Sequence, residues 1–217
     1  MLSAAALCHT IAVAADIEVS VAALTLPDES TGAVHWRSTN QATEPLQLSI
    51  RYFSERVSLE SNLIEFYAEP MDPETGEAGP EPMLRMRIPE GQRLVYIVLS
   101  SDEGEDGNPR WRGNMLSAND WRAGSLKVFN SRDTPLGIVA EDRNLRIDPG
   151  GSADLHARDF DREGFPVRIY QLEPERRAVF SSTWRIAEGR RELLFIGNNR
   201  GRVTMRSLLE LQAGGER

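Results

Sequence analysis

Two tryptophan–arginine pairs offer the most specific binding chemistry in the sequence. Trp111 and Trp121 lie ten residues apart in "PRWRGNMLSANDWRAGS", and each is followed by an arginine, Arg112 or Arg122. Indole rings in a Gly- and Asn-rich segment can stack on sugars or form the centre of a protein interface, so these four residues are a candidate ligand-binding site. The same rings can instead fill a seam between two domains, and a connecting segment favours that interpretation.

A second candidate site is the charged segment "HARDFDRE". One imidazole and three carboxylates occur within eight residues, which is enough for a divalent cation if the loop folds back on itself. The candidate ligands are His156, Asp159, Asp161 and Glu163. Two arginines alternate with them and can neutralise the carboxylates, so a solvated charged loop is the favoured alternative.

Catalytic chemistry has few candidates. The chain has one cysteine and three histidines, and no serine occupies a G-x-S-x-G elbow. The 33 acidic residues provide many carboxylate pairs, so an enzyme that acts on extracellular polysaccharide stays open as an alternative. Acids at this density mostly solvate strand faces and turns. The sequence therefore favours a non-catalytic protein and indicates no cofactor.

The segments that must position these residues read as β-strands. Apolar and polar residues alternate in "DIEVSVAAL", "LQLSIRYF" and "MLRMRI", which is the pattern of strands with one solvated face. "RLVYIVLS" and "ELLFIGN" are apolar on both faces, as in strands buried between layers. Helical periodicity is nearly absent. Many short strands separated by Gly, Pro, Asn and Asp predict a sandwich or a barrel.

A pentapeptide occurs three times, as "RIPEG" at 87–91, "RIDPG" at 146–150 and "RIAEG" at 185–189. Each copy ends an alternating segment, and its glycine can adopt the positive φ that closes a tight turn. We therefore interpret the phrase as a turn and not as a binding loop. The first and third copies continue into similar apolar strands 98 residues apart (185 minus 87), and "SIRYFSER" at 49 resembles "SLKVFNSR" at 125. These internal sequence similarities predict a duplicated β unit.

Charge and the first residues bear on partners and location. The net charge of −8 disfavours binding to nucleic acid, because a phosphate backbone would meet a repulsive average field. Residues 1–15, "MLSAAALCHTIAVAA", combine a short apolar stretch with small residues suited to signal peptidase, although no basic residue precedes the stretch. A buried first strand or helix is the alternative. After cleavage, no segment is long and apolar enough to cross a membrane.

Together these patterns predict an all-β protein of two tandem, small, Ig-like β-sandwiches related by duplication, with one large β-sandwich as the alternative. The expected boundaries are a signal peptide at 1–15, sandwiches at 16–104 and 125–211, a connector at 105–124 and a tail at 212–217. The expected function is that of a periplasmic or secreted binding, adhesion or envelope-assembly module. Its partner would be a protein or a cell-surface polysaccharide, and a carbohydrate-binding module or polysaccharide-acting enzyme is the alternative.

Overall fold

The fold of the chain is all-β. A computed structural model describes residues 17–24, 33–39, 42–71, 80–103, 109–160, 164–199 and 202–210. The first eight strands are β1 (Ile17–Ala23), β2 (Ala33–Arg37), β3 (Glu44–Gln47), β4 (Val57–Leu59), β5 (Leu63–Tyr67), β6 (Leu84–Arg87), β7 (Leu94–Glu103) and β8 (Pro109–Ser117). The next eight are β9 (Ser125–Asn130), β10 (Leu136–Ala140), β11 (Arg143–Ile147), β12 (Ser152–His156), β13 (Phe165–Gln171), β14 (Arg177–Trp184), β15 (Arg191–Asn199) and β16 (Arg202–Leu209). One 3-10 turn, η2 (Ala157–Asp159), follows β12.

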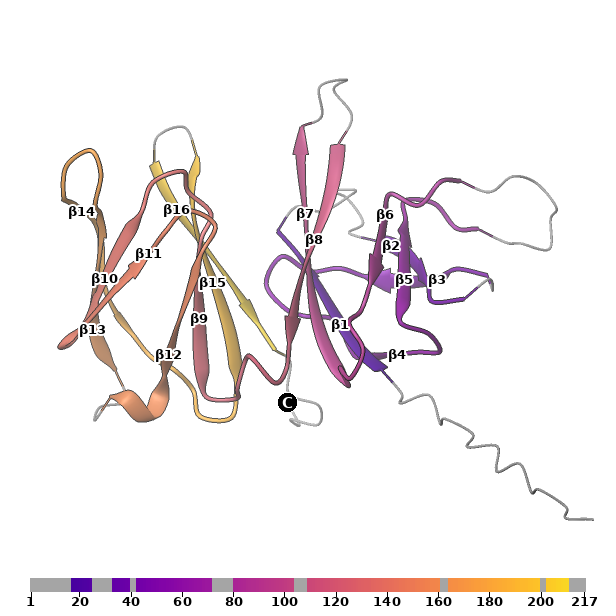
Figure 1. Cartoon of the computed structure of the whole chain (residues 1–217), viewed down its shortest axis with the longest axis horizontal. Coiled ribbons are helices and arrows are strands. Elements are labelled where there is room, and N and C mark those ends of the chain that lie inside the picture. Colours follow the sequence, from indigo (N-terminus) through magenta and orange to yellow (C-terminus); the bar gives the residue numbers. More distant parts are fainter. Residues whose placement is uncertain are drawn as a thin grey trace, which may run out of the picture.

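The strands form four four-stranded sheets that follow one another along the long axis of the molecule (Figure 1). The first sandwich has the sheet orders β4-β1-β7-β8 and β3-β2-β5-β6. The second has β12-β9-β15-β16 and β11-β10-β13-β14, which is the same arrangement with every strand number raised by eight. In both, the first and seventh strands pair in parallel, β1 with β7 and β9 with β15. The prediction of tandem sandwiches is confirmed, and the shared topology is that expected of a duplication.

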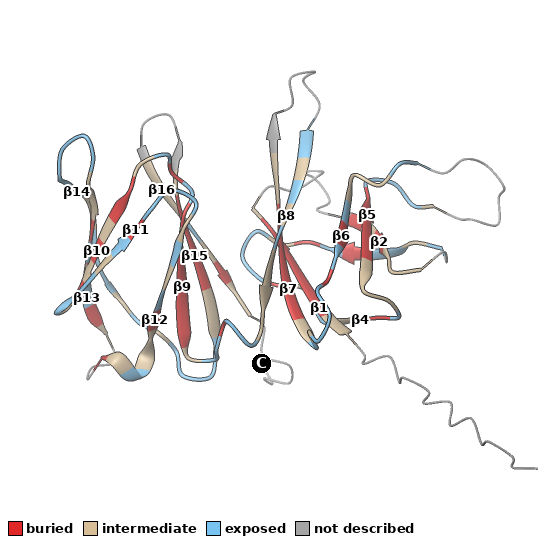
Figure 2. Cartoon of the chain, in the orientation of Figure 1, coloured by how far each residue is buried: buried red, intermediate tan, exposed pale blue. Residues whose placement is uncertain are grey.

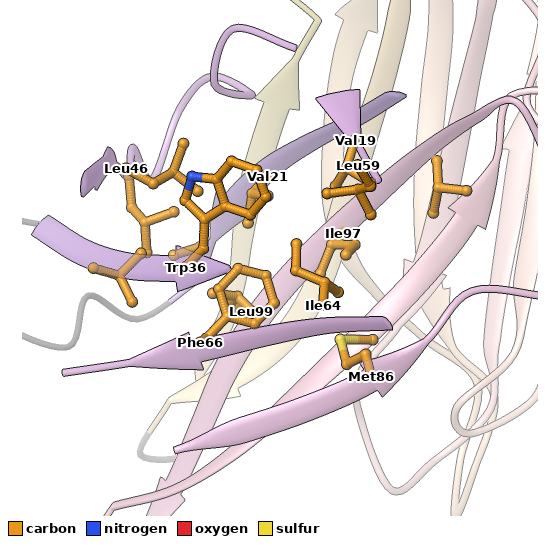
Figure 3. Packing of buried hydrophobic residues seen from close by; sticks show 14 of the residues in the cluster. Val19, Val21, Trp36, Leu46, Leu59, Ile64, Phe66, Met86, Ile97 and Leu99 are labelled. Carbon is orange, nitrogen blue, oxygen red and sulfur yellow. The ribbon is translucent and has the colours of Figure 1, made fainter. Parts of the chain in front are cut away.

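Alternation along the strands builds the core of the first sandwich. Val19 and Val21 of β1 and Ile97 of β7 point inward and are fully buried. They meet Ile64 and Phe66 from the opposite sheet (Figure 3). Burying a side chain of this size contributes about 1.5–3 kcal/mol, so this cluster is a principal source of stability for the first half of the chain.

The second sandwich has its own core. Val128 of β9 and Ile196 of β15 face Ile138 of β10 and Val167 of β13, and all four are fully buried. Phe160, which follows η2, stacks on Phe165 at the end of this core. Every described strand pairing stays within one half of the chain, so none joins a strand of β1–β8 to a strand of β9–β16.

The two sandwiches meet through the outer faces of their inner sheets. Tyr96 and Val98 of β7 point away from the first core, and Leu193 of β15 points away from the second. These residues, with Phe53 and Trp121, form a buried apolar cluster between the sandwiches. The buried strands of both inner sheets flank this region in Figure 2. The seam is therefore a third sheet-on-sheet contact, in addition to the one inside each sandwich.

Backbone hydrogen bonds also cross the seam. The amide of Phe53 donates to the carbonyl of Leu209 at 3.0 Å, and the amide of Leu209 donates to the carbonyl of Arg51 at 2.9 Å. These bonds surround a parallel bridge between Tyr52 and Leu209. The connection between β3 and β4 is thus joined directly to the end of β16.

The three pentapeptides are turns, as predicted. Their glycines all have positive φ, with 81° at Gly91, 71° at Gly150 and 79° at Gly189. This left-handed conformation costs a side chain with Cβ about 1–2 kcal/mol, which explains why glycine closes each turn.

The predicted connector at 105–124 requires a correction, because 109–117 form β8. This strand pairs with β7 along its whole length. Trp111 and Met115 point toward the first core, and Arg110 and Arg112 on either side of Trp111 are exposed. The irregular link between the last strand of the first sandwich and β9 is therefore limited to 118–124. The predicted signal peptide at 1–15 and the tail at 212–217 lie outside the described residues.

A search of the described residues for a helix able to span a membrane finds none.

Candidate functional site

The structure separates the two predicted tryptophans. Trp111 lies half-buried on β8 and packs against the core of the first sandwich. Trp121 is 0% exposed and lies in the seam, where its ring centroid is 4.9 Å from Tyr96 and 5.7 Å from Phe53. No surface of the Trp121 ring is left for a ligand. The position in a seam between domains, which the sequence favoured for these rings, is the observed position of Trp121.

Charged residues at the edge of the seam reinforce this position. Arg191 donates from Nε to the carbonyl of Trp121 and forms a 3.0 Å ion pair with Glu210. Glu210 also accepts a hydrogen bond from the hydroxyl of Tyr96 in the other sandwich. Burial, and then the Glu210 carboxylate, raise the pKa of Tyr96 well above its usual range. Tyr96 therefore stays protonated and acts as a structural donor across the seam.

The predicted metal ligands do not assemble within the described structure. His156 ends β12, and its amide contacts the Asp159 carboxylate at 3.4 Å. Asp159 forms an ion pair with Arg143 at 3.1 Å, so its charge is balanced by an arginine of β11. Asp161 and Glu163 lie outside the described residues. No group of three potential ligands close enough to hold a metal occurs in the part of the chain that the structure describes.

Instead, the structure brings together one member of each predicted site. Arg122 and His156 line the same pocket, which has a volume of about 230 Å³ and lies beside β9 and β12. Arg158 of η2 and Glu188 of the third pentapeptide complete its charged lining. In the sequence, Arg158 is one of the two arginines that alternate with the predicted metal ligands, and Glu188 belongs to no predicted site.

Three segments distant in sequence form this pocket because backbone hydrogen bonds join them. The amide of Ala157 donates to the carbonyl of Gly124 at 2.9 Å, and the amide of Gly124 donates to the carbonyl of Arg190 at 2.7 Å. Gly124 has a φ of 73°, and a Cβ placed on it would lie 3.8 Å from the Gly189 nitrogen. The hydroxyl of Ser125 also bonds to the carbonyl of Arg122, which fixes the backbone that carries this arginine. The floor of the pocket is thus anchored to the sheet.

The charge of the pocket favours an anion. Arg122 and Arg158 are both exposed, and neither forms an ion pair with another described residue. Guanidinium groups present several N–H donors in a planar fork that matches carboxylate, sulfate and phosphate. The His156 imidazole can add one donor, while Glu188 contributes the only acidic side chain among the described lining residues. Two fixed positive charges therefore outnumber the single negative one.

Arg112, the remaining predicted ligand-binding residue, lies apart from this pocket. It is exposed on β8, where it pairs in register with Ser100 of β7.

No known protein-family model matches this chain, and a search of curated proteins finds no significant sequence match either.

Proposed function

We propose that the protein is an exported, non-catalytic binding module that captures an anionic group of a cell-surface polysaccharide in the pocket lined by Arg122, His156 and Arg158. The observation that carries this proposal is the presence of two arginines without described acidic partners at one pocket of about 230 Å³. Pockets for drug-sized ligands typically have volumes of about 300–1,000 Å³. The smaller volume of this pocket therefore suits a single sugar unit or its charged substituent.

The rigid support of the pocket favours binding over catalysis. Its three segments are held by backbone hydrogen bonds, and Arg122 follows Trp121, which is fixed in the seam. A site on a rigid frame loses little conformational entropy when it binds, which favours affinity. Glycoside hydrolysis in its usual form needs two carboxyl groups about 5–10 Å apart. Among the described residues that line the pocket, only Glu188 carries a carboxyl group.

Binding of alginate, an acidic polysaccharide, to the purified protein tests the proposal. Isothermal titration calorimetry should detect binding to alginate and none to neutral dextran. Each of Arg122→Gln and Arg158→Gln should weaken binding by about tenfold, equivalent to about 1.4 kcal/mol, because each removes one charge-assisted contact. Added salt should weaken the remaining affinity. Arg168→Gln is the matched control, since Arg168 is an exposed arginine of β13 that does not line the pocket. Equal affinity of all three variants and the wild type would refute the assignment of the pocket.

A second candidate function, polysaccharide hydrolysis, is favoured by one observation, which is that His156 and Glu188 line the same pocket and could act as base and acid. Release of reducing ends from alginate by the wild type, abolished in Glu188→Gln, would establish this alternative.

Export is tested separately with a reporter. Residues 1–20 are fused to an alkaline phosphatase that is active only after secretion. Activity of this fusion, and its loss when Leu7 and Ile11 are changed to aspartate, would support export, because the apolar stretch is what the secretion machinery recognises. An inactive wild-type fusion would count against it.

A further inference from the structure

The edges of the four sheets differ in how well they are protected. The eight edge strands are β3, β4, β6, β8, β11, β12, β14 and β16. An edge strand presents backbone N–H and C=O groups without partners, and natural proteins usually protect such edges with charges, prolines or short length.

Seven of these eight edges carry such protection. β4 has only three residues. The other six each contain a proline or a charged residue after their first position, represented by Pro45 of β3, Arg85 of β6, Arg110 of β8, Arg146 of β11, Asp154 of β12 and Arg206 of β16.

β14 is the exception. It has eight residues, and after Arg177 the sequence "AVFSSTW" contains neither a charge nor a proline. Ser181, Ser182 and Thr183 in its centre are exposed. Its counterpart in the first sandwich, β6, has four residues, two of which are arginines. The duplicated topology therefore places an open edge in the second sandwich where the first has a protected one.

The pairing of β13 shows which backbone groups of β14 face the open side. The carbonyl of Pro166 accepts a hydrogen bond from the amide of Glu141, so the backbone groups of Pro166 face β10. Successive residues of a strand alternate in direction, so Val167 and its partner Ser182 face each other. The amides and carbonyls of Ser181 and Thr183 consequently point to the free edge, where no described strand lies.

We propose that the free edge of β14 binds an extended peptide segment of a partner protein by strand addition. The charge around the edge indicates the chemistry of this segment. Arg176 and Arg177 precede the uncharged centre, Arg185 follows it, and Arg168 stands opposite Ser181 in the sheet. The partner segment therefore has an uncharged, β-branched centre with acidic residues at both ends.

The same charges disfavour a second copy of this chain at the edge. Antiparallel pairing of two β14 strands over their full length, centred on Ser181, would place Arg177 opposite Arg185 (177 plus 185 is twice 181). Like charges directly opposite each other destabilise a strand pair. The proposed edge is also separate from the anion pocket, none of whose lining residues belongs to β14, so it does not depend on the function proposed above.

The test uses a fluorescein-labelled synthetic peptide with alternating valine and threonine in its centre and two acidic residues at each end. Fluorescence anisotropy should show binding to the wild-type protein. Ser181→Pro and Thr183→Pro should each weaken it by at least about tenfold, because each removes an outward amide donor. Ser181→Ala and Thr183→Ala are the matched controls, since they change the same side chains but keep the amides. A peptide with lysines in place of the acids should bind more weakly.

Hydrogen exchange gives a second readout that does not depend on the stability of the proline variants. The peptide should slow exchange of amides in 177–184 of the wild-type protein and leave β6 unchanged. Absence of binding, equal binding to the proline and alanine variants, or protection elsewhere would each overturn the proposal. A reversible dimer in sedimentation that Ser181→Pro abolishes would assign the edge to a second copy of the chain and would also overturn it.

Discussion

At the scale of single residues, the one acid that is buried among the described residues lies outside the pocket. Glu65 of β5 is 5% exposed, although its neighbours Ile64 and Phe66 are the ones that face the core. Its carboxylate accepts hydrogen bonds from the Tyr67 hydroxyl at 2.7 Å, from Arg37 Nε at 2.7 Å and from Arg85 Nε. Burial by itself would raise the pKa of Glu65, but these three donors stabilise the charged form and lower it below the usual value.

This lowered pKa predicts a pH dependence of stability. A carboxyl whose pKa is lower in the folded state stabilises the protein above the unfolded value, here 4.5, and the contribution is lost as the pH falls through the folded value. Urea unfolding should therefore show wild type more stable than Glu65→Gln at neutral pH, with a difference that shrinks as the pH falls below 4.5. Glu44→Gln, at an exposed position of β3, is the matched control and should change the stability little. A constant difference for Glu65→Gln would contradict the assigned role of its charge.

Individual site residues were partly predictable from the sequence. The residue types of Trp121 and Arg122, and the acids near His156, make these residues candidates in the sequence, but as members of two separate sites. Only the backbone bonds that join Gly124 to Ala157 and to Arg190 bring these residues together. Such contacts depend on the pairing of β9 with β12 and with β15, for which a single sequence contains no local signal.

At the scale of elements, alternation predicted strands reliably but did not predict the direction of every side chain. The two apolar strands matched at an offset of 98 are one residue out of phase. Val95 and Ile97 point into the first core, whereas Leu193 and Phe195, their counterparts at that offset, face the seam. A shift of one residue moves a whole strand face to the other side of the sheet. The sequence match therefore identified two equivalent connections between sheets, from β6 to β7 and from β14 to β15, but not the register of the strands that follow them.

The second sequence similarity, between "SIRYFSER" at 49 and "SLKVFNSR" at 125, does not join equivalent positions of the two sandwiches. Residues 125–130 form β9, which corresponds to β1 in the first sandwich, whereas 49–56 connect β3 to β4. Similar alternation in both segments produced the match. The strand β8 was missed for the opposite reason, since Gly113 and Asn114 are typical of loops. A Cβ on Gly113 would lie 2.3 Å from the sulfur of Met86 and would displace that side chain, so the glycine reflects close packing between the two sheets and not a turn.

At the scale of the whole molecule, the seam should couple the unfolding of the two sandwiches. Trp121, Leu193 and Tyr96 are fully buried in it, and Glu210 joins Arg191 to Tyr96 at its edge. The sequence showed that β7 and β15 are apolar on both faces and favoured a seam for the tryptophans, but it contained no signal that the outward faces of these two strands contact each other. Exposed apolar side chains on both inner sheets would be unfavourable in isolated domains, so the two halves should unfold together.

Substitutions of two adjacent leucines in β15 can distinguish this coupling between the sandwiches from the stability of the second core. Leu193 faces the seam, and Leu194 faces the core of the second sandwich. Calorimetry of the wild type should show a single unfolding transition. In Leu193→Asp, the aspartate is buried when the seam is closed but solvated when the sandwiches separate. The buried charge therefore favours separation, and this variant should show two unfolding transitions. Leu194→Ala should lower stability by about 2–5 kcal/mol through a core cavity and keep one transition. Two transitions in the wild type, or one in Leu193→Asp, would show that the apolar seam does not couple the sandwiches.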